Sequence, residues 1–423
     1  MSRSTNSAPP RSPLAIFLRF LRFGAGAWGG PAAQIAELRR ELVDREGWVD
    51  ADRFRRALAV YQALPGPEAH ELCCWLGMIA GGRAGALAAG LGFMLPGLVL
   101  MLGASWLYVS LGTESGIGTD LARAAFAGVQ AAVVGLVLVA TIRLTRSIVP
   151  QVGRESGQPR SLRAWAWCFA ALGAFTQSIG APFWIALLAG GIGLSLASRR
   201  RATAAGVALL IGLACAASFR SALPTVHEPQ SQHGEAQVTP TRLFAVGLTG
   251  GLVTFGGAYT AIPVVRDAAT GTHGWIDESQ FLDGLAIGGV LPAPLVIFVT
   301  FVGYLGGGLS GALLMTLGMF LPAFSFTLIG HEFFERLVAR KAIHAFLDGV
   351  ACAVCGVIAA TAVVLFVELA GLTNANAAAK PHAAGLVAVA LVASVALQRL
   401  RFRFAVPLVL VVAALAGMLL FAE

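Results

Sequence analysis

Apolar runs that approach or reach the length of a bilayer crossing recur along nearly the whole of this 423-residue chain. A helix needs about 20 apolar residues to cross the hydrocarbon core, and Trp184–Ala197, Ala204–Ser218 and Phe404–Phe421 are examples of such runs. Charged residues make up 12% of the chain, about half the share of an average soluble protein. The sequence therefore predicts an all-α polytopic membrane protein whose surroundings are the lipid bilayer.

The formal net charge of +8 comes largely from short basic clusters that lie between the apolar runs. Such clusters follow the positive-inside rule, so they indicate orientation in the membrane and no nucleic-acid partner. The stretches that we place in the cytoplasm are Arg143–Arg163, Arg199–Arg201, Arg336–Lys341 and Arg399–Arg403.

The second half of the chain repeats the first. Gly47-Trp48-Val49-Asp50 returns as Gly274-Trp275-Ile276-Asp277 (274 − 47 = 227), and the same shift relates Leu64-Pro65-Gly66-Pro67 to Leu291-Pro292-Ala293-Pro294. The predicted domains are a cytoplasmic tail (1–13), a first repeat (14–202), a linking helix with an external loop (203–241) and a second repeat (242–423).

Helices placed between the loops cross the membrane about 13 times, with the N-terminus in the cytoplasm and the C-terminus outside. Six helices form each half, and an extra span at 203–220 joins them and reverses the second half, so we predict two inverted-topology six-helix repeats. This topology places the basic stretch Arg39–Arg56 outside, against the positive-inside rule. Re-entrant segments are the alternative, and they would lower the count to roughly ten. The predicted spans are 14–38, 60–82, 86–111, 121–142, 164–180, 183–198, 203–220, 242–265, 281–303, 309–330, 345–369, 384–398 and 404–421.

Two kinds of helix break occur in both halves. Gly29-Gly30 and Gly256-Gly257 are adjacent glycines, while Pro65-Gly66-Pro67 and Pro292-Ala293-Pro294 remove backbone donors and favour a new helix start. Broken helices in transporters expose N–H groups at the midplane, where they bind small anions. We predict a substrate-binding site at these four breaks. The alternative role for the glycines is close helix packing.

Polar side chains near the breaks extend this prediction. Arg39 and Arg266 form a matched cationic pair, and a guanidinium holds a tetrahedral oxyanion through two parallel hydrogen bonds. The alternative is that both arginines meet lipid headgroups. Gln34 and Tyr259 are further candidate substrate-binding donors.

Two acidic residues, Glu68 and Glu71, follow Pro67 on the first helical turn. Acids there stabilise the positive end of a helix. The functional alternative is that one of them binds and releases a proton during transport.

The chain has no phosphate-binding loop of the Gly-x-x-x-x-Gly-Lys-Ser/Thr kind, so ATP hydrolysis is not expected. The His and Glu residues of His227–Gln237 match no regular ligand spacing, so we expect no metal site and no cofactor. Cys352 and Cys355 have redox spacing but lie in an apolar run, and packing is the simpler role.

The motifs together resemble the chromate ion transporter family in its two-domain, long-chain form. They are Trp28-Gly29-Gly30-Pro31 with Gln34, Leu64-Pro65-Gly66-Pro67, and Phe255-Gly256-Gly257-Ala258-Tyr259 with Ile262-Pro263. The resemblance implies a bacterial, multi-pass inner-membrane protein that exports chromate, driven by the membrane potential or a proton gradient, and confers resistance. Chromate shares the size, charge and shape of sulfate, so sulfate is expected to compete. Ala293 departs from the Pro-Gly-Pro pattern of the first half.

Other functions stay open at this point. In one alternative, a transporter of the same architecture carries sulfate or another oxyanion. In another, the protein is a membrane-bound chromate reductase that uses Cys352 and Cys355. A third alternative is a purely structural membrane scaffold. The oligomeric state is also open, with a homodimer among the alternatives.

Overall fold

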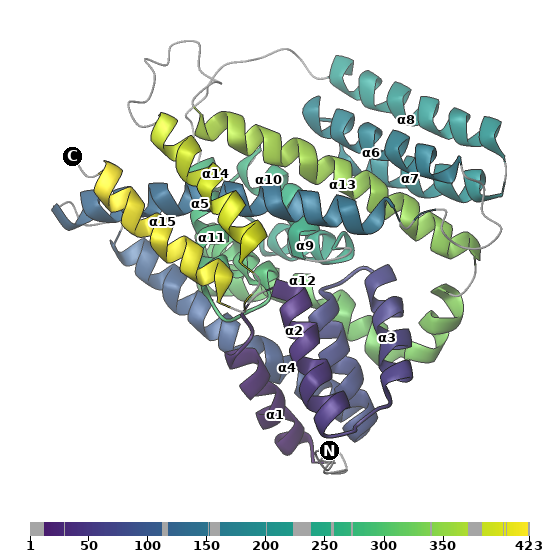
Figure 1. Ribbon diagram of the computed structural model, residues 1–423, viewed down its shortest axis with the longest axis horizontal. Helices are drawn as coiled ribbons and strands as arrows, with labels where there is room; N and C mark the ends of the chain where they lie inside the picture. Colours follow the sequence, from purple (N-terminus) through teal and green to yellow (C-terminus); the bar gives the residue numbers. More distant parts are fainter. Residues whose placement is uncertain are drawn as a thin grey trace. The chain divides into compact units, whose positions relative to one another are not determined.

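The described part of the chain is helical throughout (Figure 1). The computed structural model describes residues 12–28, 30–111, 117–150, 152, 161–199, 201–222, 238–254, 258–271, 274–338, 341–370, 383–400, 402 and 404–421. Within these ranges the elements are α-helices, a π-helix and short 3-10 helices, with no strand. The predicted all-α class is confirmed for these residues.

The element bounds follow the two halves of the sequence. The first half contains α1 (Pro13–Ala25), α2 (Gly30–Leu38), the π-helix η1 (Arg39–Arg45), α3 (Ala51–Ala63), α4 (Glu68–Leu111), α5 (Ile117–Ile148), α6 (Leu162–Ser178), α7 (Phe183–Ser198) and α8 (Ala202–Ala222). The second half contains α9 (Pro240–Leu252), the 3-10 helix η2 (Ala258–Thr260), α10 (Ala261–Thr270), α11 (Glu278–Val290), the 3-10 helix η3 (Leu295–Ile297), α12 (Phe298–Val338), α13 (Lys341–Leu369), α14 (Ala383–Arg399) and α15 (Ala405–Phe421).

Among the described residues, four helices are long and apolar enough to cross a membrane. Their apolar segments are Glu68–Ser110, Ala124–Ile148, Leu295–Gly330 and Ile343–Val367. Shorter apolar helices cover Phe183–Ser198, Ala202–Ser218, Ala383–Arg399 and Ala405–Phe421. These helices agree with a polytopic membrane protein, while the count of about 13 crossings stays a prediction.

Large apolar side chains are exposed in stripes along the long helices. In α12, Leu309, Leu313 and Leu317 recur every four residues and are about half exposed. Residues four apart share one face of a helix, so the three leucines form a continuous apolar strip. A strip of this kind is unfavourable in water and is the surface that lipid chains cover.

The long helix α4 reverses direction near its middle. Gly82 has φ 62° and ψ −153°, a conformation that is essentially restricted to glycine. On either side of it, a Cβ on Gly77 would lie 2.3 Å from the carbonyl oxygen of Gly85, and His70 Nε2 lies 3.2 Å from the carbonyl oxygen of Gly90. The element is therefore a hairpin of two antiparallel helices.

The same hairpin recurs in α12. Gly308 has φ 60° and ψ −148° and stands 226 positions after Gly82 (308 − 82 = 226). A Cβ on Gly303 would lie 2.5 Å from the carbonyl oxygen of Gly311, as at the corresponding pair in α4. Both turns lie at the boundaries that the sequence predicted between spans 60–82 and 86–111 and between 281–303 and 309–330.

The chain folds into two compact units, and each takes segments from both halves. The first unit contains Met1–Leu136, Gln237–Glu335 and Ala378–Glu423, and the second contains Val137–Ala236 and Arg336–Ala377. The predicted domains follow the sequence repeat and not these units, so that division stays a prediction.

Glycines set the close helix contacts inside each unit. In the first unit, Gly128 of α5 packs against Ala413 of α15, where an added Cβ would lie 2.1 Å from the carbonyl oxygen of Ala413. In the second unit, Gly356 of α13 packs against Ala170 of α6, and the corresponding distance is 1.7 Å. Helices of one half thus pack on helices of the other.

Candidate functional site

The helices break where the glycine pairs predicted. Helix α1 ends at Ala25 and α2 begins at Gly30, so the predicted span 14–38 consists of two short helices. In the second half, α9 ends at Leu252 and η2 begins at Ala258. Gly29, Gly256 and Gly257 lie outside the described residues, but both breaks are bounded on either side.

The proline turns are also confirmed as helix breaks. Helix α3 ends at Ala63 and α4 begins at Glu68, directly after Pro67. Helix α11 ends at Val290, and η3 follows Pro294, with Pro292 buried between them. Each predicted span that contains such a turn, 60–82 and 281–303, is therefore interrupted and not continuous.

The breaks of one half contact the turns of the other. The N–H of Gly66 donates to the carbonyl oxygen of Thr254 at 2.7 Å, which joins the first proline turn to the end of α9. In the reciprocal direction, the indole Nε1 of Trp28 donates to the carbonyl oxygen of Val290 at 3.1 Å. All four residues belong to the first unit, so the four predicted breaks adjoin in two reciprocal pairs.

The two proline turns differ in one important bond. Gly66 has φ 150° and turns its N–H toward Thr254, whereas the N–H of Ala293 donates within its own turn, to Leu291, at 2.9 Å. The side chain of Ala293 instead packs close to Gly97 of α4. A Cβ added to Gly97 would lie only 2.4 Å from the Cβ of Ala293. The alanine at the second turn thus serves close packing.

Gln34 lies beside the first glycine break and is 3% exposed. Its Nε2 donates to the carbonyl oxygen of Ala27 at 2.8 Å, and its Oε1 has no hydrogen-bond partner. Gln34, which was predicted to donate to the substrate, therefore donates to the backbone at the glycine break. In the second half, Tyr259 lies in η2, directly after the glycine break, and is half-buried.

The two arginines are placed differently. Arg39 opens η1 with a side chain that is 49% exposed and lies 3.8 Å from Asp44. Arg266 is only 12% exposed and pairs with Glu278 at 2.5 Å and with Asp267 at 3.6 Å. Because carboxylates already engage both guanidinium groups, an anion would have to exchange with these ion pairs.

The two acids at the start of α4 are both buried but have different partners. Glu68 is 4% exposed and accepts a hydrogen bond from the Gln62 side chain. Glu71 is fully buried, and neither of its carboxyl oxygens has a hydrogen-bond partner. A Cβ on Gly66 would lie 2.5 Å from Glu71 Oε1, so this carboxyl lies directly against the first proline turn.

Sequence reasoning missed His70, a fully buried histidine next to these acids. Its ring packs edge-on against Phe320 and Phe324 of α12, with centroid distances of 4.9 and 4.8 Å. The signal was available, since an ionisable residue within an apolar span is rare and marks a packed or functional position. The histidine joins the hairpin of the first half to that of the second.

A second buried polar cluster surrounds Asp283 of α11. Its carboxylate accepts hydrogen bonds from the hydroxyl of Tyr108 and from Nε2 of Gln130, each at 2.7 Å. These donors lie on α4 and α5, so the cluster is another polar link between the halves. Its hydrogen bonds satisfy both carboxylate oxygens.

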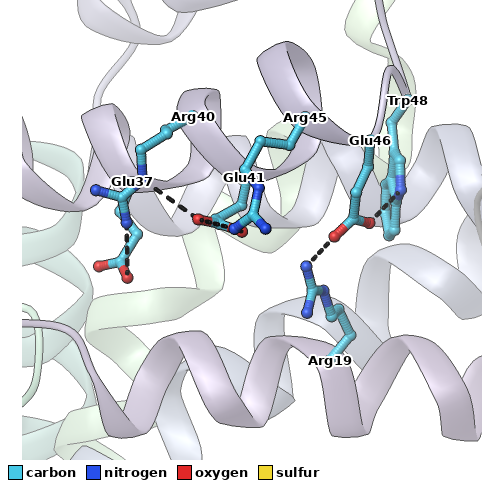
Figure 2. Close-up of polar contacts among 7 residues, drawn as sticks. All are labelled: Arg19, Glu37, Arg40, Glu41, Arg45, Glu46 and Trp48. Atoms are coloured by element: carbon cyan, nitrogen blue, oxygen red, sulfur yellow. Dashed lines mark hydrogen bonds and ion pairs between the residues drawn. The ribbon is translucent and has the colours of Figure 1, made fainter. Parts of the chain in front are cut away.

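Charged residues gather around η1, as Figure 2 shows. Arg45 pairs with Glu41 at 2.7 Å, and Arg19 of α1 pairs with Glu46, which also accepts from Trp48 Nε1 at 2.9 Å. Burial raises the pKa of Glu41, but hydrogen bonds from Arg45 and Arg40 outweigh it and hold that pKa below its ordinary value. The positive charge of the predicted external stretch is thus largely paired.

Cysteines and metal-ligating side chains are the residue types that would carry redox or metal chemistry. Cys352 and Cys355 are free thiols buried in α13. The described residues contain no group of three or more His, Cys, Asp or Glu side chains placed to hold a metal ion. The arrangement is one of helix ends, backbone donors and buried acids.

Comparisons with known proteins agree on one family. The family model described as "Chromate transporter" matches residues 14–194 and 241–418. The chromate transport protein of Pseudomonas aeruginosa is 49% identical over 84% of this chain and 81% of that protein. The chromate transport protein of Cupriavidus metallidurans is 28% identical over 86% of this chain and 84% of its own length.

A probable chromate transport protein of Synechococcus elongatus is 27% identical over 96% of this chain and 94% of its own length. No solved structure matches the chain.

Proposed function

Because this chain belongs to the chromate transporter family, we propose that it exports chromate from the bacterial cytoplasm across the inner membrane and so confers chromate resistance. The named relatives are transport proteins, which favours transport over chemistry on the anion. The membrane potential, negative inside, drives the exit of a dianion.

The reciprocal contacts between breaks and turns carry this proposal. Gly66 with Thr254 and Trp28 with Val290 bring helix ends of both halves together in one unit. Helix N-termini concentrate free N–H groups and partial positive charge, which favours anions over cations. A dianion bound among these ends contacts both halves at once.

We propose that this site contains the residues predicted from the sequence. They are Gly29, Gly30, Gln34, Arg39, Pro65, Gly66, Pro67, Gly256, Gly257, Tyr259, Arg266, Pro292, Ala293 and Pro294. The arginines exchange their carboxylate partners for the anion, and Glu68 and Glu71 take part in coupling. Sulfate, with the same shape and charge, competes for this site.

We further propose that the halves form inverted-topology repeats that rock about the site. The matched hairpins at Gly82 and Gly308 support a common ancestral fold. An odd number of crossings before the second half gives it the opposite orientation, as in many secondary transporters. The proposed total of crossings is about 13.

Chromate accumulation in energised everted membrane vesicles tests the function. Wild-type vesicles should accumulate chromate, excess sulfate should reduce it, and Arg266→Ala should lower the rate at least tenfold through the loss of one charge-assisted contact of about 1.5–3 kcal/mol. Arg266→Lys is the matched control for charge without the planar fork.

No accumulation by wild-type vesicles would refute chromate export and favour another oxyanion as the cargo. The reductase alternative is tested by replacing Cys352 and Cys355 with serine. Unchanged resistance removes that alternative.

A further inference from the structure

Glu71 is a carboxyl group that water does not reach. Its side chain is 0% exposed, and Oε1 and Oε2 both lack hydrogen-bond partners. An ionised carboxylate without a partner is strongly unfavourable in a buried site. In the conformation described here, the group therefore carries its proton.

The carboxyl lies against the proline turn of the proposed anion site. An added Cβ on Gly66 would lie 2.5 Å from Oε1 and 2.8 Å from Cδ of Glu71. The N–H of Gly66 is already donated to Thr254, so this turn does not neutralise the acid. A bound dianion at the turn and a negative Glu71 would repel each other at short range.

The surroundings of Glu71 leave this repulsion uncompensated. On α4 itself, the other titratable groups are Glu68, His70, Cys73, Cys74, Arg83 and Tyr108. Contacts to this end of the helix and its turn from other elements include the side chain of Gln62, which donates to Glu68, and the carbonyl oxygen of Thr254, which accepts from Gly66. They also include the aromatic rings of α12 that face His70. The other carboxyl group on this helical turn, Glu68, lies three residues before Glu71 and supplies no positive charge.

We propose that Glu71 is the proton-binding site of the transporter and binds its proton together with the dianion. The inference rests on the proposed function. Each proton on Glu71 strengthens anion binding, and by reciprocity each bound anion favours protonation. The proton comes from cytoplasmic water, adds to the carboxylate, and leaves with chromate on the far side, so no covalent bond in chromate changes. The net charge moved per chromate is then one negative charge instead of two.

Proton uptake on binding tests the proposal directly. Purified wild-type protein in weakly buffered detergent solution with a pH-indicator dye should take up about one proton per bound chromate at an alkaline pH at which Glu71 of the ligand-free protein has lost its proton and chromate is the dianion. Glu71→Gln, which mimics the neutral acid, should bind chromate with no proton uptake. Asp283→Asn, at a buried carboxyl group outside the proposed site, is the matched control and should keep the uptake.

Equal proton uptake by wild type and Glu71→Gln would overturn the proposal while leaving chromate transport intact. Absence of chromate binding and accumulation by wild type would instead overturn the proposed function itself. If Glu71→Gln does not fold, the pH dependence of sulfate binding to the wild-type protein tests the proposal. Its affinity for sulfate, which does not titrate in this range, should fall about tenfold per pH unit at alkaline pH, and a constant affinity would reject the linkage.

Discussion

Gly66 is the residue on which the first proline turn depends. Its φ of 150° is unfavourable for any residue with a Cβ, and that Cβ would meet Glu71 Oε1 at 2.5 Å. We expect Gly66→Ala to destabilise the protein by about 1–3 kcal/mol from backbone strain and to abolish accumulation in vesicles. Thermal unfolding in detergent and vesicle uptake measure the two effects.

Ala293 offers a matched control for this substitution. It occupies the equivalent place in the second turn but donates its N–H locally, to Leu291. Ala293→Gly should cost less than about 1 kcal/mol, mainly in chain entropy. Equal losses for both substitutions would mean that the two turns play the same role.

Individual side chains show where sequence reasoning stops. The turns at Pro65 and Pro292 and the break before Gly30 were predictable, because proline and glycine act on their own backbone. The contact of Gly66 with Thr254 was not, because a single sequence does not say which distant segments meet. The same limit applies to the arginines, which match in sequence but differ in exposure.

The hairpin turns are the elements that give α4 and α12 their form. At Gly82 and Gly308 an added Cβ would meet nothing within 4 Å, so only backbone strain opposes a larger residue. We expect Gly82→Ala and Gly308→Ala each to cost about 1–3 kcal/mol. Thermal unfolding of the purified variants checks this.

Gly103, farther along α4, serves as the control for both turns. It too has nothing within 4 Å of an added Cβ, and its helix geometry is regular. Gly103→Ala should be neutral or stabilise by up to about 1 kcal/mol. A loss as large as that of Gly82→Ala would contradict the explanation by strain.

At the same scale, sequence periodicity located the apolar segments but overestimated their continuity. The predicted spans 14–38 and 60–82 each consist of two short helices in the structure. Hydropathy averages over a window of about 19 residues, so it does not register a break of four residues. The glycine and proline pattern did register it, since these residues weaken helices locally.

For the whole molecule, the exchange of helices between halves predicts mutual dependence. If residues 1–230 and 231–423 are produced as separate chains, neither should accumulate stably alone, because α5 and α13 each pack on helices of the other half. Produced together, they should copurify and restore vesicle uptake. Co-purification with a tag on one half measures this, and transport by either half alone would contradict it.

The sequence repeat did not reveal this exchange. It related the halves residue by residue, but the compact units combine Met1–Leu136 with Ala378–Glu423. Repeats record common ancestry, whereas packing follows complementary surfaces, such as Gly128 against Ala413. Organisation by ancestry and organisation by contact are therefore different properties of this chain.

The packing of α5 against α14 and α15 also constrains how the protein is made. The ribosome synthesises α5 long before α14 and α15. Until those helices are inserted, the glycine face of α5 at Gly128 and Gly135 is exposed to lipid. The first unit cannot close until the last helix has been inserted. Biogenesis of this protein therefore ends in a late assembly step, and chains truncated before α15 should be substrates for membrane quality-control proteases.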